Sequence, residues 1–452
     1  MEIDLLRATA ADLHDLLNSG QLTSLELVQQ CHRQILRHND RLKALITITP
    51  SEYLEDVATK MDQERQRGCI RSPLHGIPFV VKNAFNTTED MKLQTTNGGW
   101  AFEDCRPPHT AKVITQAIDA GMILMGKANL SQFGNWKASN MPGGWSARGG
   151  QTQSAYVRGG VIDDGIYGHS NPSGSSTGSA VAVSAGFAPV SIGSDFNGSL
   201  TNPAIRASLY TIRVTPGIVS EAGGFPFSVD RDSVDPMANG VEDLVNFLNI
   251  IADKSHPRVP SQGYGTEKRL GWGDLTIATL DPRKWYLSEQ VQKPQPGALD
   301  QIIRETLEAY EKLKSLAHRV IGPVELMTDD VLSATNEDMM KIIISSLSEL
   351  IAFNQQHRDI ELPAAEYPHQ DKLEQSVEFC NSLSKEGYAR LDRAVTAAGL
   401  ENSIDKVLRE NHADLIIAPA DSFVPDVTAF AKYPSVTLPL GYLDWNGDHL
   451  DC

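Results

Sequence analysis

The stretch from residue 173 to 204 limits the fold more than any other part of the sequence. It reads SGSSTGSAVAVSAGFAPVSIGSDFNGSLTNPA. Its centre predicts a helix over 179–186 and then a buried strand over 189–193, followed by a glycine turn. A helix that leads into a buried strand is the alternation from which α/β sheets are built.

The same alternation occurs earlier in the chain. The apolar run from Ile77 to Val81 predicts a strand that delivers Lys82 at its end. A predicted helix over 110–121 leads into a short apolar strand over 122–126. We therefore expect an α/β protein with a largely parallel sheet.

The two ends of the sequence are mainly helical. Thr9 predicts the N-cap of one helix, and Thr23 with Glu26 has the spacing of a capping box before a second helix. A strand over 44–49 and a polar helix follow. Beyond Val241 the pattern predicts helices over 241–252, 298–317, 329–356, 370–397 and 401–411 and a strand over 414–420. No linker interrupts these elements, so we expect a single domain over residues 1–452.

The composition excludes several classes of function. The chain has 40 Lys and Arg against 57 Asp and Glu, and the net charge of −17 disfavours nucleic acid and anionic membranes as partners. Its five cysteines are odd in number and never in CxxC spacing, which argues against a disulfide framework and a zinc site. The sequence shows neither a secretory leader nor an apolar run of about 18 residues, so a cytoplasmic location is expected.

Two serine arrangements compete for the role of nucleophile. The string GSSTG matches a GxSxG elbow with Ser176 at its centre, but an elbow serine follows a buried strand and Ser176 follows the polar GIYGHSNPS. The favoured arrangement uses Ser175 and Ser199, which are 24 residues apart and can meet through a helix, a turn and a returning strand. Asn197 and Gly198 suit a tight turn whose N–H groups would hold an oxyanion.

Lys82 is the candidate base for this arrangement. A lysine acts as a base only when it is unprotonated, and burial at the end of an apolar strand lowers its pKa. The alternative is a lysine that extends from the strand end into water, which is the commoner case. From these residues alone both interpretations stay open.

Nearly the whole chain resembles the amidase-signature family. The resemblance rests on motifs that stand in the family's order: LTSLELVQQ, LHGIPFVVKN, AGMILMGKANLSQF, GSSTGSAVAVSAG and DLIIAPA. The segment GWSARGGQT is most similar to the peptide-amidase-like and fungal amidase branch. The resemblance implies a central mixed, mostly parallel twisted sheet covered by helices on both faces. It also implies a signature core over about 74–220 and a more variable helical portion over about 241–411.

The resemblance also implies a Ser, cis-Ser, Lys triad. It makes Ser199 the nucleophile, Ser175 the relay on a cis peptide after Gly174, and Lys82 the base. It places the oxyanion hole at the backbone N–H groups of Phe196, Asn197, Gly198 and Ser199. The supporting positions are Gly174, Ser176, Ser194 and Asp195.

The expected activity is that of a serine amidohydrolase that cleaves an amide C–N bond through an acyl-enzyme. Such chemistry needs no metal or organic cofactor, and its partner would be a small-molecule or peptide amide; a homodimer is compatible with the resemblance. Three alternatives stay open: an impaired or scaffold homologue in a biosynthetic setting, an amidotransferase subunit, and an acyl-transfer or esterase variant. The loop over 144–172 argues against the amidotransferase.

Several positions depart from the family pattern and leave the substrate pocket undetermined. They are Asn83, Asn197, Arg206 and Asp235. The chain also ends at Cys452, where relatives continue, so the C-terminus is expected to be short for the family.

The segment from 136 to 172 predicts a long glycine-rich loop, and loops of that length are often functional. It carries three aromatic candidates for the acyl pocket, for which packing within the loop is the commoner role: Trp145, Tyr156 and Tyr167. His75 and His169 lie near motif residues and are interpreted as local hydrogen-bonding partners.

Overall fold

The structure is a computed structural model that describes residues 1–228, 230–266, 270–341, 347–364 and 366–441. In this part of the chain, seven strands form a central sheet: β1 (Leu45–Ile48), β2 (Pro78–Lys82), β3 (Ile123–Ala128), β6 (Val190–Asp195), β7 (Tyr210–Arg213), β8 (Ser233–Ala238) and β12 (Ser435–Thr437). Their order across the sheet is β1-β3-β2-β6-β8-β7-β12. The remaining strands are β4 (Trp145–Ser146), β5 (Gly150–Gln151), β9 (Thr276–Thr279), β10 (Arg319–Ile321) and β11 (Leu415–Ile417).

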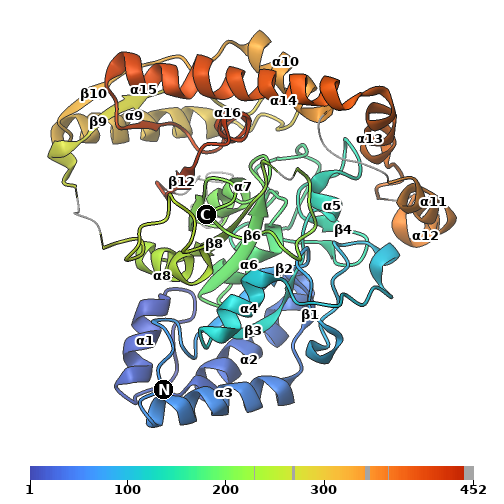
Figure 1. Ribbon diagram of the computed structural model, residues 1–452, viewed down its shortest axis with the longest axis vertical. Helices are drawn as coiled ribbons and strands as arrows, with labels where there is room; N and C mark the ends of the chain where they lie inside the picture. The colour runs from blue at the N-terminus through green and yellow to red at the C-terminus, as the bar shows by residue number, and fades with distance from the viewer. Residues whose placement is uncertain (229, 267–269, 342–346, 365, 442–452) are drawn as a thin grey trace.

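Helices surround this sheet (Figure 1). The first half of the chain contributes α1 (Ala10–Asn18), α2 (Ser24–Leu42), α3 (Ser51–Gln66), α4 (Lys112–Asp119), α5 (Gln132–Asn135), α6 (Thr177–Ser184), α7 (Thr201–Arg206) and α8 (Val241–Ile251). The second half contributes α9 (Ala298–Leu316), α10 (Asp329–Lys341), α11 (Ser348–Gln356), α12 (Arg358–Glu361), α13 (Asp371–Ser382), α14 (Lys385–Gly399), α15 (Asp405–Asn411) and α16 (Val424–Ala431). In Figure 1, α1, α2 and α3 gather at the end of the molecule opposite α14 and α15.

The expected mixed sheet is confirmed, but fewer of its strand pairs are parallel than the sequence predicts. Within the central sheet of the described residues, β3, β2 and β6 pair in parallel, and the other four pairings are antiparallel. The reason is that β8 lies between β6 and β7 and runs opposite to both. The parallel centre brings the carboxyl ends of β2 and β6 to one edge, which is where α/β proteins usually bind their ligands.

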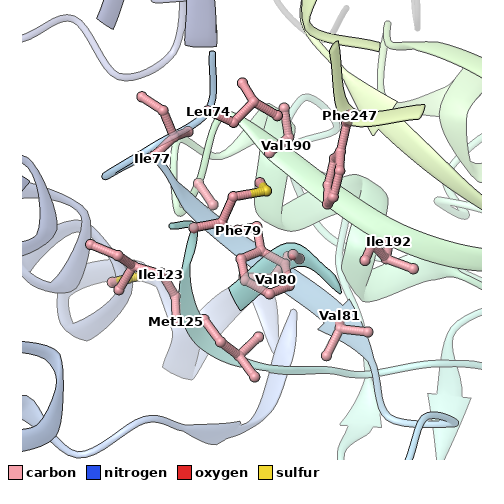
Figure 2. Close-up of a cluster of buried hydrophobic side chains, with 14 of the residues drawn as sticks. Leu74, Ile77, Phe79, Val80, Val81, Ile123, Met125, Val190, Ile192 and Phe247 are labelled. Carbon is pink, nitrogen blue, oxygen red and sulfur yellow. The ribbon is translucent and has the colours of Figure 1, made fainter. Parts of the chain in front are cut away.

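Strand β2 has helices on both of its faces. Phe79 packs edge-to-face against Phe247 of α8, with 6.0 Å between the ring centres (Figure 2). Lys82 lies three residues further on and so points to the opposite face, where it reaches Ser175 at the start of α6. The strand is buried along its whole length, so its terminal lysine is buried as well.

The predicted helix starts near the N-terminus are confirmed. Thr9 caps α1 through a capping box with Asp12, and Thr23 caps α2 through a capping box with Glu26. Each box satisfies backbone N–H groups that a helix start would otherwise leave unpaired.

The second half of the chain differs from the prediction in several elements, and α12, α16, β8 and β12 are among those that the sequence did not predict. The predicted helices over 329–356 and 370–397 are each divided, into α10 with α11 and α13 with α14, and Ser384 caps the start of α14. The sequence also missed β9 and β10, which form a separate parallel sheet with β11 in the order β10-β9-β11. These strands are only three or four residues long, which is too short for a clear alternation of polar and apolar residues. The prediction of a short C-terminus concerns Cys452, which lies outside the described residues.

Candidate active site

Lys82 is buried at the edge of the sheet and does not extend into water. Lys82 is 1% exposed, and its Nζ lies 2.8 Å from Ser175 Oγ. The same Nζ lies 3.0 Å from Ser194 Oγ and 3.4 Å from the Ser194 carbonyl oxygen. All of these partners are uncharged, so none of them holds the lysine in its ammonium form by an ion pair.

This environment changes the proton affinity of Lys82. Burial lowers the pKa of Lys82 from 10.5 to about 7, although the negative charges of Asp195 and Asp232 act in the opposite direction. A large share of the lysine is therefore an unprotonated amine at neutral pH. Such an amine can accept a proton from the Ser175 hydroxyl.

Ser175 stands directly before α6, and the peptide bond between Gly174 and Ser175 is cis. The chain is held there by Ser131, whose N–H donates to the Ser175 carbonyl at 3.1 Å. A Cβ on Gly174 would lie 2.2 Å from Ser131 Oγ, so only glycine fits at this position. Gly174 therefore lets the chain pack tightly beside Ser175.

Ser176 has a different role from its neighbour. Its Oγ donates to the Ser194 carbonyl at 3.0 Å and accepts from the Ser194 N–H at 3.2 Å. Its own N–H donates to the Ser199 carbonyl at 2.8 Å. Ser176 thus joins the start of α6 to the end of β6, and it is fully buried and does not line the cavity described below.

Ser199 lies in the turn between β6 and α7, and it is half-buried. The Ser199 hydroxyl makes no hydrogen bond to the described residues. Gly198, the residue before it, has a φ of +81°, a conformation that favours glycine. Lys82, Ser175 and Ser199 all line one cavity. The structure therefore brings the three predicted triad residues to the same place.

The carboxylate of Asp195 holds the turn before α7 through hydrogen bonds to backbone N–H groups. It accepts the N–H of Gly198 at 2.9 Å and the N–H of Leu200 at 2.7 Å. It also forms a buried ion pair with Arg213 at 3.3 Å. Both charges are excluded from water, so each depends on the other.

The four expected oxyanion donors are not equivalent. The Gly198 N–H is already donated to Asp195. The N–H groups of Phe196, Asn197 and Ser199 donate to no acceptor in the described residues. These three groups are the ones free to bind a substrate oxygen.

The cavity at this edge has a volume of about 260 Å³. Its apolar lining residues include Phe85, Trp136, Phe196, Phe225, Phe227, Met339 and Met340. Its charged and polar lining residues include Asp195, Asn197, Glu221, Asp232, Asn336, Lys372 and Asp426. A cavity that combines apolar side chains with polar groups can hold a small molecule.

Of the four departures from the family pattern, only Asn197 lines the cavity. Its Nδ2 donates to Asp426 Oδ1 at 2.9 Å, which ties the serine turn to α16. Burial raises the pKa of Asp426 to about 6, because the hydrogen bond from Asn197 only partly offsets the loss of water.

The other three departures support the surrounding structure. Asn83 Oδ1 accepts the N–H of Thr96 at 2.7 Å. Arg206 forms an ion pair with Asp421 at 2.8 Å. Asp235 accepts the N–H of Val214 at 3.1 Å, and burial raises its pKa to about 7.

One of the three loop aromatics reaches the cavity. Tyr167 lines it, and its hydroxyl accepts a hydrogen bond from Asn135 Nδ2 at 2.9 Å. Trp145 instead donates to Glu366 at 2.6 Å, and Tyr156 donates to a backbone carbonyl at 3.3 Å. For these two residues the packing role is confirmed.

The two histidines also lie outside the cavity lining. His75 is buried, with its Nε2 3.0 Å from the Met61 carbonyl oxygen. Burial and the charge of Arg206 lower the pKa of His169 to about 4. Neither histidine is placed to act on a substrate in this cavity.

Sequence reasoning missed the cavity residues that come from distant parts of the chain. Glu221 and Asp232 lie in the connections around β7 and β8, and Met339 and Met340 come from α10. Asp232 directly precedes a buried strand, which is a signal that could have marked it as a strand-end carboxylate. The methionines have no comparable signal, because a helical pattern does not say which surface the helix covers.

In the described part of the chain, no group of three or more His, Cys, Asp or Glu side chains is arranged to hold a metal ion. The helices of the described residues include none with the length and hydrophobicity of a membrane span.

Known proteins resemble this chain over most of its length. A putative amidase of the fungus Arthroderma benhamiae is 28% identical over 97% of this chain and 78% of its own length. A probable amidase of Arabidopsis thaliana is 28% identical over 96% of this chain and 84% of its own length. The crystal structure of the native peptide amidase from Stenotrophomonas maltophilia is 28% identical, covers 97% of this chain and 91% of its own, and superposes with a TM-score of 0.79. Residues 26–446 match the model of the Amidase family, and the chain therefore belongs to this family.

Proposed function

We propose that this chain cleaves the C–N bond of a carboxylic amide through an acyl-enzyme on Ser199, with Ser175 as relay and Lys82 as base. The observation that carries the proposal is the contact of 2.8 Å between buried Lys82 and Ser175, on a cavity that Ser199 also lines. Membership of the Amidase family makes the chain an amide hydrolase, and the proposal adds the residues that perform the reaction.

The reaction would proceed in two steps. Ser199 Oγ attacks the carbonyl carbon while its proton moves to Ser175 Oγ, and the Ser175 proton moves to Lys82 Nζ. The N–H groups of Phe196, Asn197 and Ser199 stabilise the oxyanion that forms. The lysine then returns a proton to the leaving nitrogen, and water releases the acid from Ser199 by the reverse path.

The same cavity and one of the relatives support a proposal for the substrate class. One of the similar solved structures is a peptide amidase. We propose a small-molecule or peptide amide as substrate, because the apolar lining residues can hold an acyl group while the serine turn holds its carbonyl.

Replacing Ser199 by alanine tests the proposal. Hydrolysis of simple amides should fall at least about a thousandfold, because the residual rate comes from binding and the oxyanion donors alone. A fluorophosphonate probe should label the native chain at Ser199. Ser176→Ala, which alters the adjacent serine of the elbow motif, should leave labelling at Ser199 detectable.

Further outcomes separate the alternatives. Labelling should disappear in Lys82→Ala, because the serine is then no longer activated. Undiminished turnover by Ser199→Ala would disprove the assignment, and labelling at Ser176 would restore the elbow interpretation. A folded native chain that neither hydrolyses amides nor reacts with the probe would favour a scaffold protein.

A further inference from the structure

Asp232 lies on the opposite side of the serine turn from Lys82. It directly precedes β8, whose first residue Ser233 pairs with Asp195 at the end of β6. Strand β6 lies between β2 and β8 in the sheet, and adjacent strands are about 4.8 Å apart. Lys82 and Asp232 therefore flank the end of β6, and both line the cavity.

The carboxylate of Asp232 is only half satisfied. Its Oδ2 accepts the N–H groups of Phe227 at 2.7 Å and Ser228 at 3.0 Å. Its Oδ1 is buried and accepts no hydrogen bond from any described residue, and the residue as a whole is 7% exposed. A buried acceptor without a partner is costly, so its presence beside a catalytic cavity calls for an explanation.

The other carboxylates that line the cavity either have hydrogen-bond or ion-pair partners or are largely neutral at pH 7. Asp195 is paired with Arg213 and accepts backbone N–H groups. Asp426 accepts a hydrogen bond from Asn197. Glu221, whose pKa burial and the charge of Asp232 raise to about 8, is largely neutral at pH 7.

One further cationic residue, Lys372, lines the cavity, and burial lowers its pKa. Burial raises the pKa of Asp232 to about 7, while backbone hydrogen bonds and the charges of Lys82 and Arg213 lower it. The negative charges that act on Lys82 are those of Asp195 and Asp232. Of these two carboxylates, Asp232 has an oxygen without a hydrogen-bond partner among the described residues.

We propose that Asp232 is a positioning residue that acts through Lys82, by stabilising the ammonium that Lys82 becomes when it accepts the serine proton. The proposal rests on the proposed function, in which Lys82 is the base. No proton leaves the relay: the Ser199 proton moves to Ser175, the Ser175 proton moves to Lys82, and Asp232 supplies only a negative charge. Without that charge Lys82 holds a proton less strongly.

The pH dependence of kcat/KM tests this role. In the native chain the acidic limb reports protonation of the free enzyme's base. In Asp232→Asn the limb should move to lower pH, because the ionised fraction of Asp232 no longer favours the ammonium of Lys82. The rate of Ser199 labelling by the fluorophosphonate should show the same shift, which a purely structural loss of activity would not produce.

A control and a second variant keep the test independent of folding. Asp243 is another buried carboxylate, and it accepts the N–H groups of Ala10 and Ala11 at the start of α1, away from the cavity lining. Asp243→Asn should leave the midpoint of the limb unchanged. Asp232→Ser removes the charge but retains an oxygen that can accept from the turn, so it should repeat the shift if Asp232→Asn does not fold.

The outcomes distinguish this inference from the proposed function. An unchanged midpoint in both Asp232 variants, with amide hydrolysis still dependent on Ser199, would overturn the role of Asp232 alone. A shift of equal size in Asp243→Asn would overturn it as well. Full hydrolysis by Ser199→Ala would instead overturn the proposed function on which this inference rests.

Discussion

At the scale of single residues, the chemistry of the site depends on how Lys82 is buried. The apolar run of β2 predicts a lysine at a strand end, but the same pattern fits a lysine that extends into water. The structure decides between the two because the Lys82 amine is buried and forms hydrogen bonds with Ser175 and Ser194. The price of this arrangement is stability, since a neutral lysine inside the protein gives up a proton that it would keep in water.

The stability of the protein should therefore depend on Lys82. Between pH 7 and 10.5 the unfolded chain binds a proton at this lysine that the folded chain does not, so folding becomes more favourable as pH rises through this window. Lys82→Met should abolish hydrolysis yet stabilise the protein at pH 7 by about 1–3 kcal/mol, since lost hydrogen bonds offset part of the gain. Thermal unfolding should show the difference in Tm shrinking as pH approaches 10.

An exposed lysine provides the control. Lys314→Met replaces a side chain that is 54% exposed, and the Tm difference between this variant and the native chain should be nearly constant with pH. A Tm difference for Lys82→Met that does not change with pH would contradict a buried neutral amine.

At the scale of elements, the turn after β6 is held by a single carboxylate. Asp195 accepts the N–H groups of Gly198 and Leu200 and pairs with Arg213 of β7. The sequence placed Asp195 among the supporting positions only through the family resemblance. Its function in the fold became clear from the contacts of β6, α7 and β7.

Removing this carboxylate should loosen the turn. Asp195→Ala leaves the Arg213 charge buried without its partner and two N–H groups unpaired, so the free energy of unfolding should fall by about 3–5 kcal/mol. Chemical denaturation measures the change. Glu311→Ala breaks an exposed ion pair with Lys314 and should cost less than about 1 kcal/mol. A cost for Asp195→Ala no larger than that of the control would show that the turn is held by other contacts.

At the scale of the whole molecule, the cavity has two sources. Lys82, Ser175 and Ser199 come from strand ends and turns around the central sheet. Helices α10 and α13 contribute further lining side chains from the second half of the chain. Figure 1 shows α10 and α13 on the far side of the sheet from α1, α2 and α3. This division suggests that the reaction and the choice of acyl group are determined by different parts of the chain.

Enlarging one residue of α10 should change the choice of substrate. Met340 is half-buried and lines the cavity, so Met340→Trp should raise KM about tenfold for amides with a bulky acyl group and leave small amides little affected. Steady-state kinetics on a series of acyl groups measures the effect. Val331→Trp alters an exposed position of the same helix and should have no effect on the series. Equal losses for small and bulky amides would contradict a role of α10 in selecting the acyl group.

Local signals in the sequence predicted the helix caps at Thr9 and Thr23, the strand that delivers Lys82, the strand over 189–193, and the tight turn before Ser199. These features depend on neighbours within a few residues, so periodicity and turn chemistry predict them. The proposed preference for Ser175 over Ser176 required the family resemblance, and the hydrogen bonds between Ser176 and Ser194 support it.

Only the tertiary structure decided the environment of the reactive groups. The burial of Lys82, the unpaired oxygen of Asp232 and the position of Met340 all come from residues that are far apart in the chain. Whether a lysine is neutral depends on every group that excludes water from it, and no local pattern records those groups. The sequence thus determined which residues stand at the strand ends. The packing of distant segments decided whether these residues are charged and which cavity they line.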